Sequence, residues 1–240
     1  FVSGMGVAFS GHAQAKHLME SQPMKMAASE ALWEDSGDPA AWTAFALVDS
    51  NNQENSFEIN IPYALSYLAY EEFSGEVKGM KTLQKEYEEK YGEGNYIPPV
   101  KTTFWSFRIM VGAGMLMIFT SFLGLLLNFY KKLEDSQFYL KGMVWLISFP
   151  FIANSAGWIM TEIGRQPWTV FGLMTTSASV SPNVSKASLL FSFLSFTAIY
   201  TVLAILLVYL FIREIKKGSD HTAHEDKEVA VDPFDQGAYF

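Results

Sequence analysis

The sequence contains no cysteine. The protein can therefore form no disulfide, and no thiolate is available as a metal ligand or as a nucleophile. The chain also has no excess of basic residues. Its net charge is −8, and residues 1–103 hold 15 acidic but only 7 basic side chains. Proteins that bind nucleic acid cluster Lys and Arg to neutralise phosphates, so nucleic acid is not an expected partner.

Histidine is scarce, with His12 and His17 near the start of the chain and His221 and His224 near its end. A metal centre inside a membrane would therefore take Met or Glu from this chain and its His ligands from elsewhere. The tail sequence SDHTAHED favours a solvated tail over a weak metal site. The sequence also lacks a glycine-rich phosphate loop, zinc-type ligand spacing and a credible Ser-His-Asp set.

Apolar and aromatic residues are abundant, with half of the chain apolar and 20 Phe, 11 Tyr and 6 Trp. Three stretches carry no charged residue: 109–130, 142–161 and 187–212. At about 1.5 Å per helical residue, each reaches roughly 30 Å, the thickness of the hydrocarbon core of a bilayer. The sequence therefore predicts an all-α integral membrane protein, a transmembrane helical bundle surrounded by lipid.

Basic residues after two of these runs indicate the orientation. Lys131 and Lys132 follow the first run, and Arg213, Lys216 and Lys217 follow the third, which places both ends in the cytoplasm. The predicted segments are the end of a truncated transmembrane helix at 1–19, an extracytoplasmic loop at 20–103, a transmembrane helix at 104–130, a cytoplasmic loop at 131–139, a transmembrane helix at 140–163, an extracytoplasmic loop at 164–186, a transmembrane helix at 187–213 and a cytoplasmic tail at 214–240. We expect a fragment of a longer membrane protein.

The loop at 20–103 is predicted to be a folded, mostly helical domain. The stretch SQPMKMAASEALWED at 21–35 contains a run of helix formers after Pro23, which suits a first helical position. The stretch KTLQKEYEEKYG at 81–92 predicts a second helix that ends at Gly92. The two prolines of NYIPPVK at 95–101 favour an extended chain before the first long apolar run.

Arg108 directly precedes that run, and Met110 lies in its first turn. Most methionines in a membrane helix are packing residues, and an arginine at a helix end is commonly an anchor that reaches to the interface. The two residues lie about 200° apart around a helix, so they cannot contact the same atom. They could instead flank one large flat ligand, with Met110 offering a thioether sulfur and Arg108 pairing with a carboxylate.

Glu162 follows the second run, with Trp158 four residues before it and Arg165 three residues after it. This spacing puts the three side chains on one helix face, close to the outer boundary where Gly164 and Pro167 end the helix. Two interpretations have equal weight. Glu162 forms an interfacial ion pair with Arg165, or it acts as an oxygen ligand or proton-relay group.

Lys25 and Glu30 lie on the first predicted helix of the outer loop, five residues apart. That spacing turns them roughly 140° from each other, so it does not imply a mutual ion pair. Solvated charges are the ordinary interpretation. Each side chain could also hydrogen-bond an oxygen of a quinone-like ligand if the helix covers a pocket.

Three stretches together resemble subunit I of the cytochrome bd-type quinol oxidases. The stretch GWIMTEIGRQPW at 157–168 resembles the signature of that family, and FWSFRIMVG at 104–112 is similar to the segment whose methionine ligates the low-spin haem b. The stretch QPMKMAASEALWE at 22–34 resembles the start of its quinol-binding loop. The resemblance extends over residues 10–212, and the outer loop resembles the short-loop branch, for which menaquinol is the expected donor.

The resemblance implies a role for each candidate residue. Met110 would be an axial ligand of the low-spin haem b, with Arg108 nearby. Glu162 would ligate the high-spin haem b, with Trp158 beside it and Arg165 close to the haem edges, so that Glu162 and Arg165 serve catalysis. The residues that match the quinol-binding positions are Lys25 and Glu30.

The resemblance also implies a larger assembly in a bacterial cell membrane. The chain would hold the end of the sixth and the last three of nine spans, and the His ligands of the low-spin haem and of haem d would lie in the N-terminal half of the subunit. Subunit II, and a small single-helix subunit as a further candidate, would be partners. The complex would oxidise quinol on the outer face and reduce O₂ to water, generating a proton gradient without pumping, whereas this fragment alone would be inactive.

Two other classes of function are kept as alternatives, a haem-free transporter and a structural subunit. In a transporter, Arg108, Glu162 and Arg165 would line a polar pathway. These charges all lie near helix ends, however, and none lies at mid-membrane, where transport sites usually are.

Overall fold

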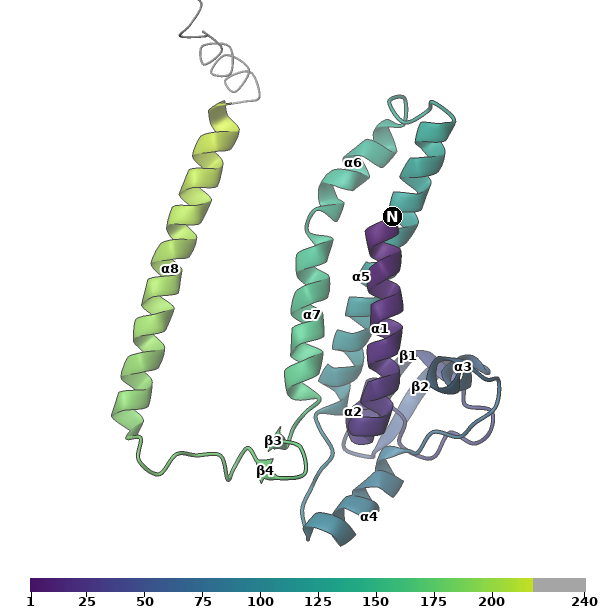
Figure 1. Cartoon of the computed structure of the whole chain (residues 1–240), viewed down its shortest axis with the longest axis vertical. Coiled ribbons are helices and arrows are strands. Elements are labelled where there is room, and N and C mark those ends of the chain that lie inside the picture. The colour runs from purple at the N-terminus through teal and green to yellow at the C-terminus, as the bar shows by residue number, and fades with distance from the viewer. Residues whose placement is uncertain (218–240) are drawn as a thin grey trace, which may run out of the picture. The chain divides into compact units, whose positions relative to one another are not determined.

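A computed structural model of the chain describes residues 1–217. The part of the predicted tail from residue 218 on, with His221 and His224, lies outside the described residues, whereas residues 214–217 continue the last helix. The chain divides into two compact units, residues 1–180 and the part from residue 181 on, and each unit is described by itself. Figure 1 shows the helices and strands of both.

Three helical segments are long and apolar enough to cross a membrane, which confirms the predicted membrane fold. The first is α5 (Val100–Phe129), and the last is α8 (Lys186–Lys217), the helix of the second unit. The middle segment, Gln137–Ile163, is interrupted. The three segments begin within four residues of the transmembrane helices predicted to start at residues 104, 140 and 187.

The middle segment forms two helices, α6 (Gln137–Leu146) and α7 (Phe149–Ile163), where the sequence analysis expected one. Figure 1 shows the break between them. Pro150 has no N–H to donate to the carbonyl of Leu146, four residues earlier, and its ring clashes with that carbonyl in a regular helix. Within the break, the hydroxyl of Ser148 donates to the carbonyl of Trp145 at 2.7 Å.

The helix α1 (Val2–Ser21) lies alongside α5 in Figure 1. The two helices approach closely at Gly4, where a Cβ atom would lie 2.9 Å from Cγ1 of Ile118. The next helix, α2 (Pro23–Ser29), begins at the predicted Pro23 and also packs against α1 and α5.

The outer loop contains the helices that the sequence predicts and a hairpin that it did not. The helix α4 (Met80–Tyr91) ends at Gly92, as expected, and a short helix α3 (Ala64–Tyr70) precedes it. The hairpin consists of two antiparallel strands, β1 (Trp42–Asp49) and β2 (Glu54–Ile61). Its turn is held by Asp49, whose Oδ1 accepts from the backbone N–H groups of Asn51 and Asn52 at 2.9 and 3.3 Å.

The largest group of buried apolar residues joins this loop to the start of α5. Phe104 and Val100 of α5 meet Ala28 of α2, Met80 of α4 and Ala46 of β1. Trp168 also belongs to this core and begins a second small hairpin, formed by β3 (Trp168–Val170) and β4 (Met174–Thr175) after α7. The core therefore fixes the ends of α5 and α7 relative to α2.

Candidate functional site

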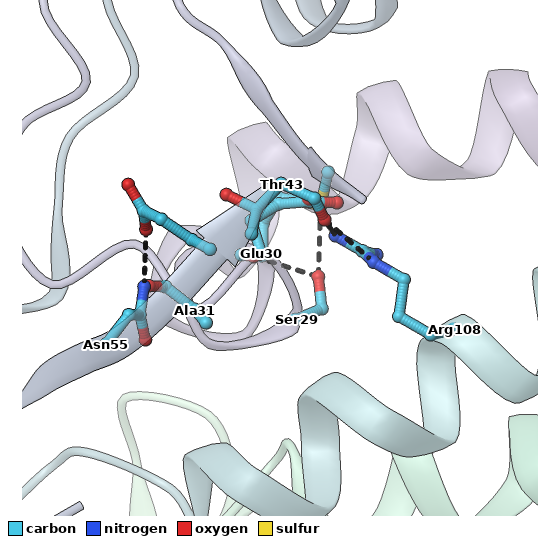
Figure 2. Close-up of polar contacts among 8 residues, drawn as sticks. Ser29, Glu30, Ala31, Thr43, Asn55 and Arg108 are labelled. Carbon is cyan, nitrogen blue, oxygen red and sulfur yellow. Dashed lines mark hydrogen bonds and ion pairs between the residues drawn. The ribbon is translucent and has the colours of Figure 1, made fainter. Parts of the chain in front are cut away.

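Arg108 reaches from α5 into the outer loop, as Figure 2 shows. Its Nη2 donates to Oε2 of Glu30 at 2.5 Å, and Nε and Nη2 donate to the carbonyl of Thr43 at 3.0 and 2.6 Å. The guanidinium also lies over the rings of Trp42 and Phe104, at 4.7 and 4.6 Å from their centroids. One side chain thus joins α5 to both α2 and β1.

The Arg108–Glu30 ion pair is buried, with 8% and 2% of the side chains exposed. Burial raises the pKa of Glu30 to about 7, although the nearby Arg108 lowers it. Nη1 of Arg108 is buried and has no hydrogen-bond partner among residues 1–217. An arginine expected to reach to the membrane interface therefore lies under the loop and retains one free donor.

Replacing Arg108 by leucine should destabilise the protein, because Glu30 would stay buried without a counter-charge. The loss of one partner of a buried pair costs about 3–5 kcal/mol, whereas an apolar pair of similar volume is often tolerated. Thermal unfolding of the complete complex should therefore show a large loss for Arg108→Leu and substantial recovery for Arg108→Leu with Glu30→Met. Equal stability of the single variant and the wild type would contradict a structural role of the pair.

The pKa of Glu30 predicts a pH dependence of stability. In the unfolded chain its pKa returns to 4.5, so the folded protein holds the proton more tightly. The resulting stability is complete below pH 4.5 and is lost as the pH rises through about 7. The melting temperature of the wild type relative to Glu30→Gln should fall between pH 5 and pH 8, and a constant difference would contradict the raised pKa.

Met110 lies on another side of α5 and faces α7. A Cβ atom at Gly157 of α7 would lie only 2.8 Å from its Sδ atom. The absence of a side chain at Gly157 therefore gives the thioether its room between the two helices. Arg108 faces the loop, so the two side chains point away from each other, in agreement with their 200° offset. That one flat ligand borders both residues stays a prediction.

Glu162 and Arg165 form an ion pair at the end of α7, where Gly164 caps the helix. The two side chains are 39% and 36% exposed, so the carboxylate is accessible. Trp158 is largely exposed, one turn earlier on α7. The structure therefore contains the ion pair that the sequence suggests, and the ligand role of Glu162 stays a prediction.

Lys25 lies beside this ion pair, although the two are far apart in sequence. Its Cγ atom would be 3.0 Å from a Cβ atom at Gly164, and the side chain is only 6% exposed. Burial lowers the pKa of Lys25, Arg165 lowers it further, and Glu162 opposes both. The candidate residues therefore form two groups, Glu30 with Arg108 and Lys25 with Glu162 and Arg165.

Within residues 1–217, no group of three or more His, Cys, Asp or Glu could hold a metal ion. A haem would need only one iron ligand from this chain, and two features of the site fit a bound haem. The Sδ of Met110 takes part in no hydrogen bond within the described chain, and the free Nη1 of Arg108 suits a carboxylate. Gly157, Thr43 and Trp168 were not predicted as parts of the site, although Gly157 and Trp168 lie within the motif at 157–168.

Known proteins similar to this chain identify its family. The family model for cytochrome bd terminal oxidase subunit I matches residues 1–219. Over 237 residues the chain is 70% identical to cytochrome bd ubiquinol oxidase subunit 1 of Bacillus subtilis (strain 168), covering 99% of this chain and 51% of that protein. It is 34% identical to the putative cytochrome bd menaquinol oxidase subunit I of the same organism, over 93% of this chain and 47% of that protein.

A solved structure is similar as well. The bd oxidase from Geobacillus thermodenitrificans matches with a TM-score of 0.73 and 27% identity, covering 91% of this chain and 47% of that chain. The chain thus spans about half the length of the relatives it matches.

Proposed function

Because the chain belongs to the cytochrome bd terminal oxidase subunit I family, we propose that it forms the haem- and quinol-binding part of a terminal respiratory quinol oxidase. The complete complex oxidises quinol on the outer face of a bacterial cell membrane and reduces O₂ to water. It generates a proton gradient without pumping. The observation that carries this proposal is the 70% identity over 99% of the chain.

In this proposal, Met110 would hold the low-spin haem b and Glu162 the high-spin haem b. A thioether, together with a histidine from the N-terminal half, would suit a low-spin iron that transfers electrons. Arg108 would pair with a haem carboxylate through its free Nη1, while Trp158 and Arg165 would border the high-spin haem. The haems, with haem d as the third, supply the electron transfer and oxygen chemistry when bound.

The outer loop would bind quinol through Lys25 and Glu30. Lys25 is buried with a lowered pKa, which suits a hydrogen-bond donor to a quinol oxygen. The pKa of Glu30 is about 7, which suits a group that accepts a proton near neutral pH. Arg108 would hold the Glu30 carboxylate in place during that transfer, because it bonds both Glu30 and Thr43.

The assembly follows from the same proposal. The loop at 20–103 is extracytoplasmic and the tail at 214–240 is cytoplasmic. The partners are the N-terminal half of the same subunit, subunit II, a small single-helix subunit and lipid. Menaquinol is the donor that the short outer loop favours, and the names of the relatives include both ubiquinol and menaquinol.

A pyridine haemochrome assay on the purified complete complex tests the proposal, together with oxygen uptake driven by menaquinol or ubiquinol. We expect protohaem and quinol-dependent uptake. A complex without haem would contradict the proposal and would favour a transporter or a structural subunit.

Replacing Lys25 by alanine should raise the quinol KM by about ten- to a hundredfold, since a hydrogen bond from a charged group contributes about 1.5–3 kcal/mol. The haem spectrum should not change. Lys85→Ala is the matched control, because Lys85 is an exposed lysine of α4 in the same loop. Unaltered quinol kinetics in Lys25→Ala would contradict a role in quinol binding.

A further inference from the structure

A narrow cleft lies between α2, the segment before α5 and the chain that follows α7. Its volume is about 10 Å³, which is room for roughly one water-sized group. The cleft can therefore receive the tip of a ligand but not a whole ring. The residues around it are Gln22, Met24, Lys25, Tyr96, Gly164, Arg165, Gln166, Trp168 and Phe171.

The side chains around the cleft offer more donors than acceptors. Trp168 is 5% exposed, and its Nε1–H has no hydrogen-bond partner within residues 1–217. Lys25 is 6% exposed, and its Nζ takes part in no hydrogen bond or ion pair in the same part of the chain. The buried Nε1–H of Trp168 is costly without an acceptor, unless a ligand supplies one. The Nζ of Lys25 is not itself buried and is a second donor at the cleft.

Neighbouring groups do not supply that acceptor. The hydroxyl of Tyr96 donates to the carbonyl of Gly92 at 3.1 Å, and Oε1 of Gln166 accepts from Thr176 at 2.9 Å. The carboxylate of Glu162 pairs with Arg165. Together with Lys25, that pair leaves one net positive charge at the cleft, which favours an oxygen with negative charge.

Packing holds the indole of Trp168 and the first part of the Lys25 side chain in place. The ring of Trp168 stacks on Tyr96, with centroids 5.4 Å apart and planes inclined by 13°, and it meets Tyr91 edge-on at 5.0 Å. Gly164 lets Lys25 approach, because a Cβ atom there would lie 3.0 Å from its Cγ. The indole N–H of Trp168 is thus positioned before a ligand arrives, which lowers the entropy cost of binding.

We propose that Trp168 is a ligand-binding residue, whose Nε1–H donates together with Lys25 to an acceptor oxygen of a bound molecule. The proposal rests on the proposed function, which supplies two sources of such an oxygen. One is the oxygen of a quinol or quinone ring, and the other is a carboxylate arm of a haem. Both present an oxygen at the tip of a larger group, as the size of the cleft requires.

The test is Trp168→Phe in the complete oxidase, which keeps the stacked ring but removes the N–H. A rise of about tenfold in the quinol KM with an unchanged haem spectrum and midpoint potentials would assign the oxygen to quinol. A shift in a haem midpoint potential with an unchanged KM would assign it to a haem carboxylate. Unchanged KM and unchanged potentials would overturn the proposal.

The matched control is Trp33→Phe, because Trp33 is equally buried but its Nε1–H already donates to Asn55 at 3.1 Å. It should change neither readout. If Trp168→Phe does not assemble, a density map of the wild-type complex decides. A ligand oxygen within about 3.2 Å of Nε1 supports the proposal, and a protein group in that place overturns it. Haem content and quinol oxidation by the wild type test the proposed function separately.

Discussion

Met110→Leu should remove the low-spin haem signal from the optical spectrum of the complete oxidase, while the protein still assembles. Leucine is close to methionine in volume, so the packing between α5 and α7 should change little. It has no sulfur, however, and cannot ligate iron. Quinol oxidation should fall to a small fraction of the wild-type rate, because electrons would no longer pass through this haem.

The control for this variant is Met115→Leu. Met115 lies five residues later on the same helix and is 65% exposed, so its replacement should leave the spectrum unchanged. An unchanged low-spin band in Met110→Leu would show that Met110 is a packing residue, as most methionines in membrane helices are.

Glu162→Gln should remove the high-spin haem signal and abolish oxygen uptake. The amide has almost the same shape as the carboxylate but carries no charge and is a poor iron ligand. In the structure, the only described ion-pair partner of Glu162 is Arg165, and the carboxylate is accessible. Replacing the carboxylate by an amide therefore tests whether Glu162 has a role beyond its ion pair with Arg165.

Arg165→Lys separates the two roles of Glu162. It removes the planar guanidinium but keeps a cation next to the carboxylate. The high-spin signal should survive in Arg165→Lys and disappear in Glu162→Gln. Retention of all haem and normal oxygen uptake in Glu162→Gln would favour a simple interfacial ion pair.

The sequence predicts the long helices well because charge-free runs have a direct physical meaning in a bilayer. The break before α7 was visible in principle, since Pro150 lies inside the second run. The β1–β2 hairpin was harder to predict. Phe57, Ile59 and Ile61 alternate with polar residues along β2, which is the pattern of a strand, but the alternating run is only five residues long and its apolar side chains are exposed.

The site could be predicted only in part. The motif around Glu162 brings Arg165 close through local helix geometry, and the structure contains that pair. Glu30 and Arg108 are 78 residues apart, and the carbonyl of Thr43 leaves no trace in the sequence. Their meeting depends on how the loop packs on α5, which one sequence does not specify. Trp168 lies in the recognised motif, but its free N–H is visible only in the structure.

The most direct measurement is near-infrared magnetic circular dichroism of the oxidised complete complex, because this spectrum identifies the axial ligands of low-spin haem iron. We expect the signature of methionine with histidine in the wild type and its absence in Met110→Leu. A bis-histidine signature in the wild type would contradict the claim that Met110 binds the iron.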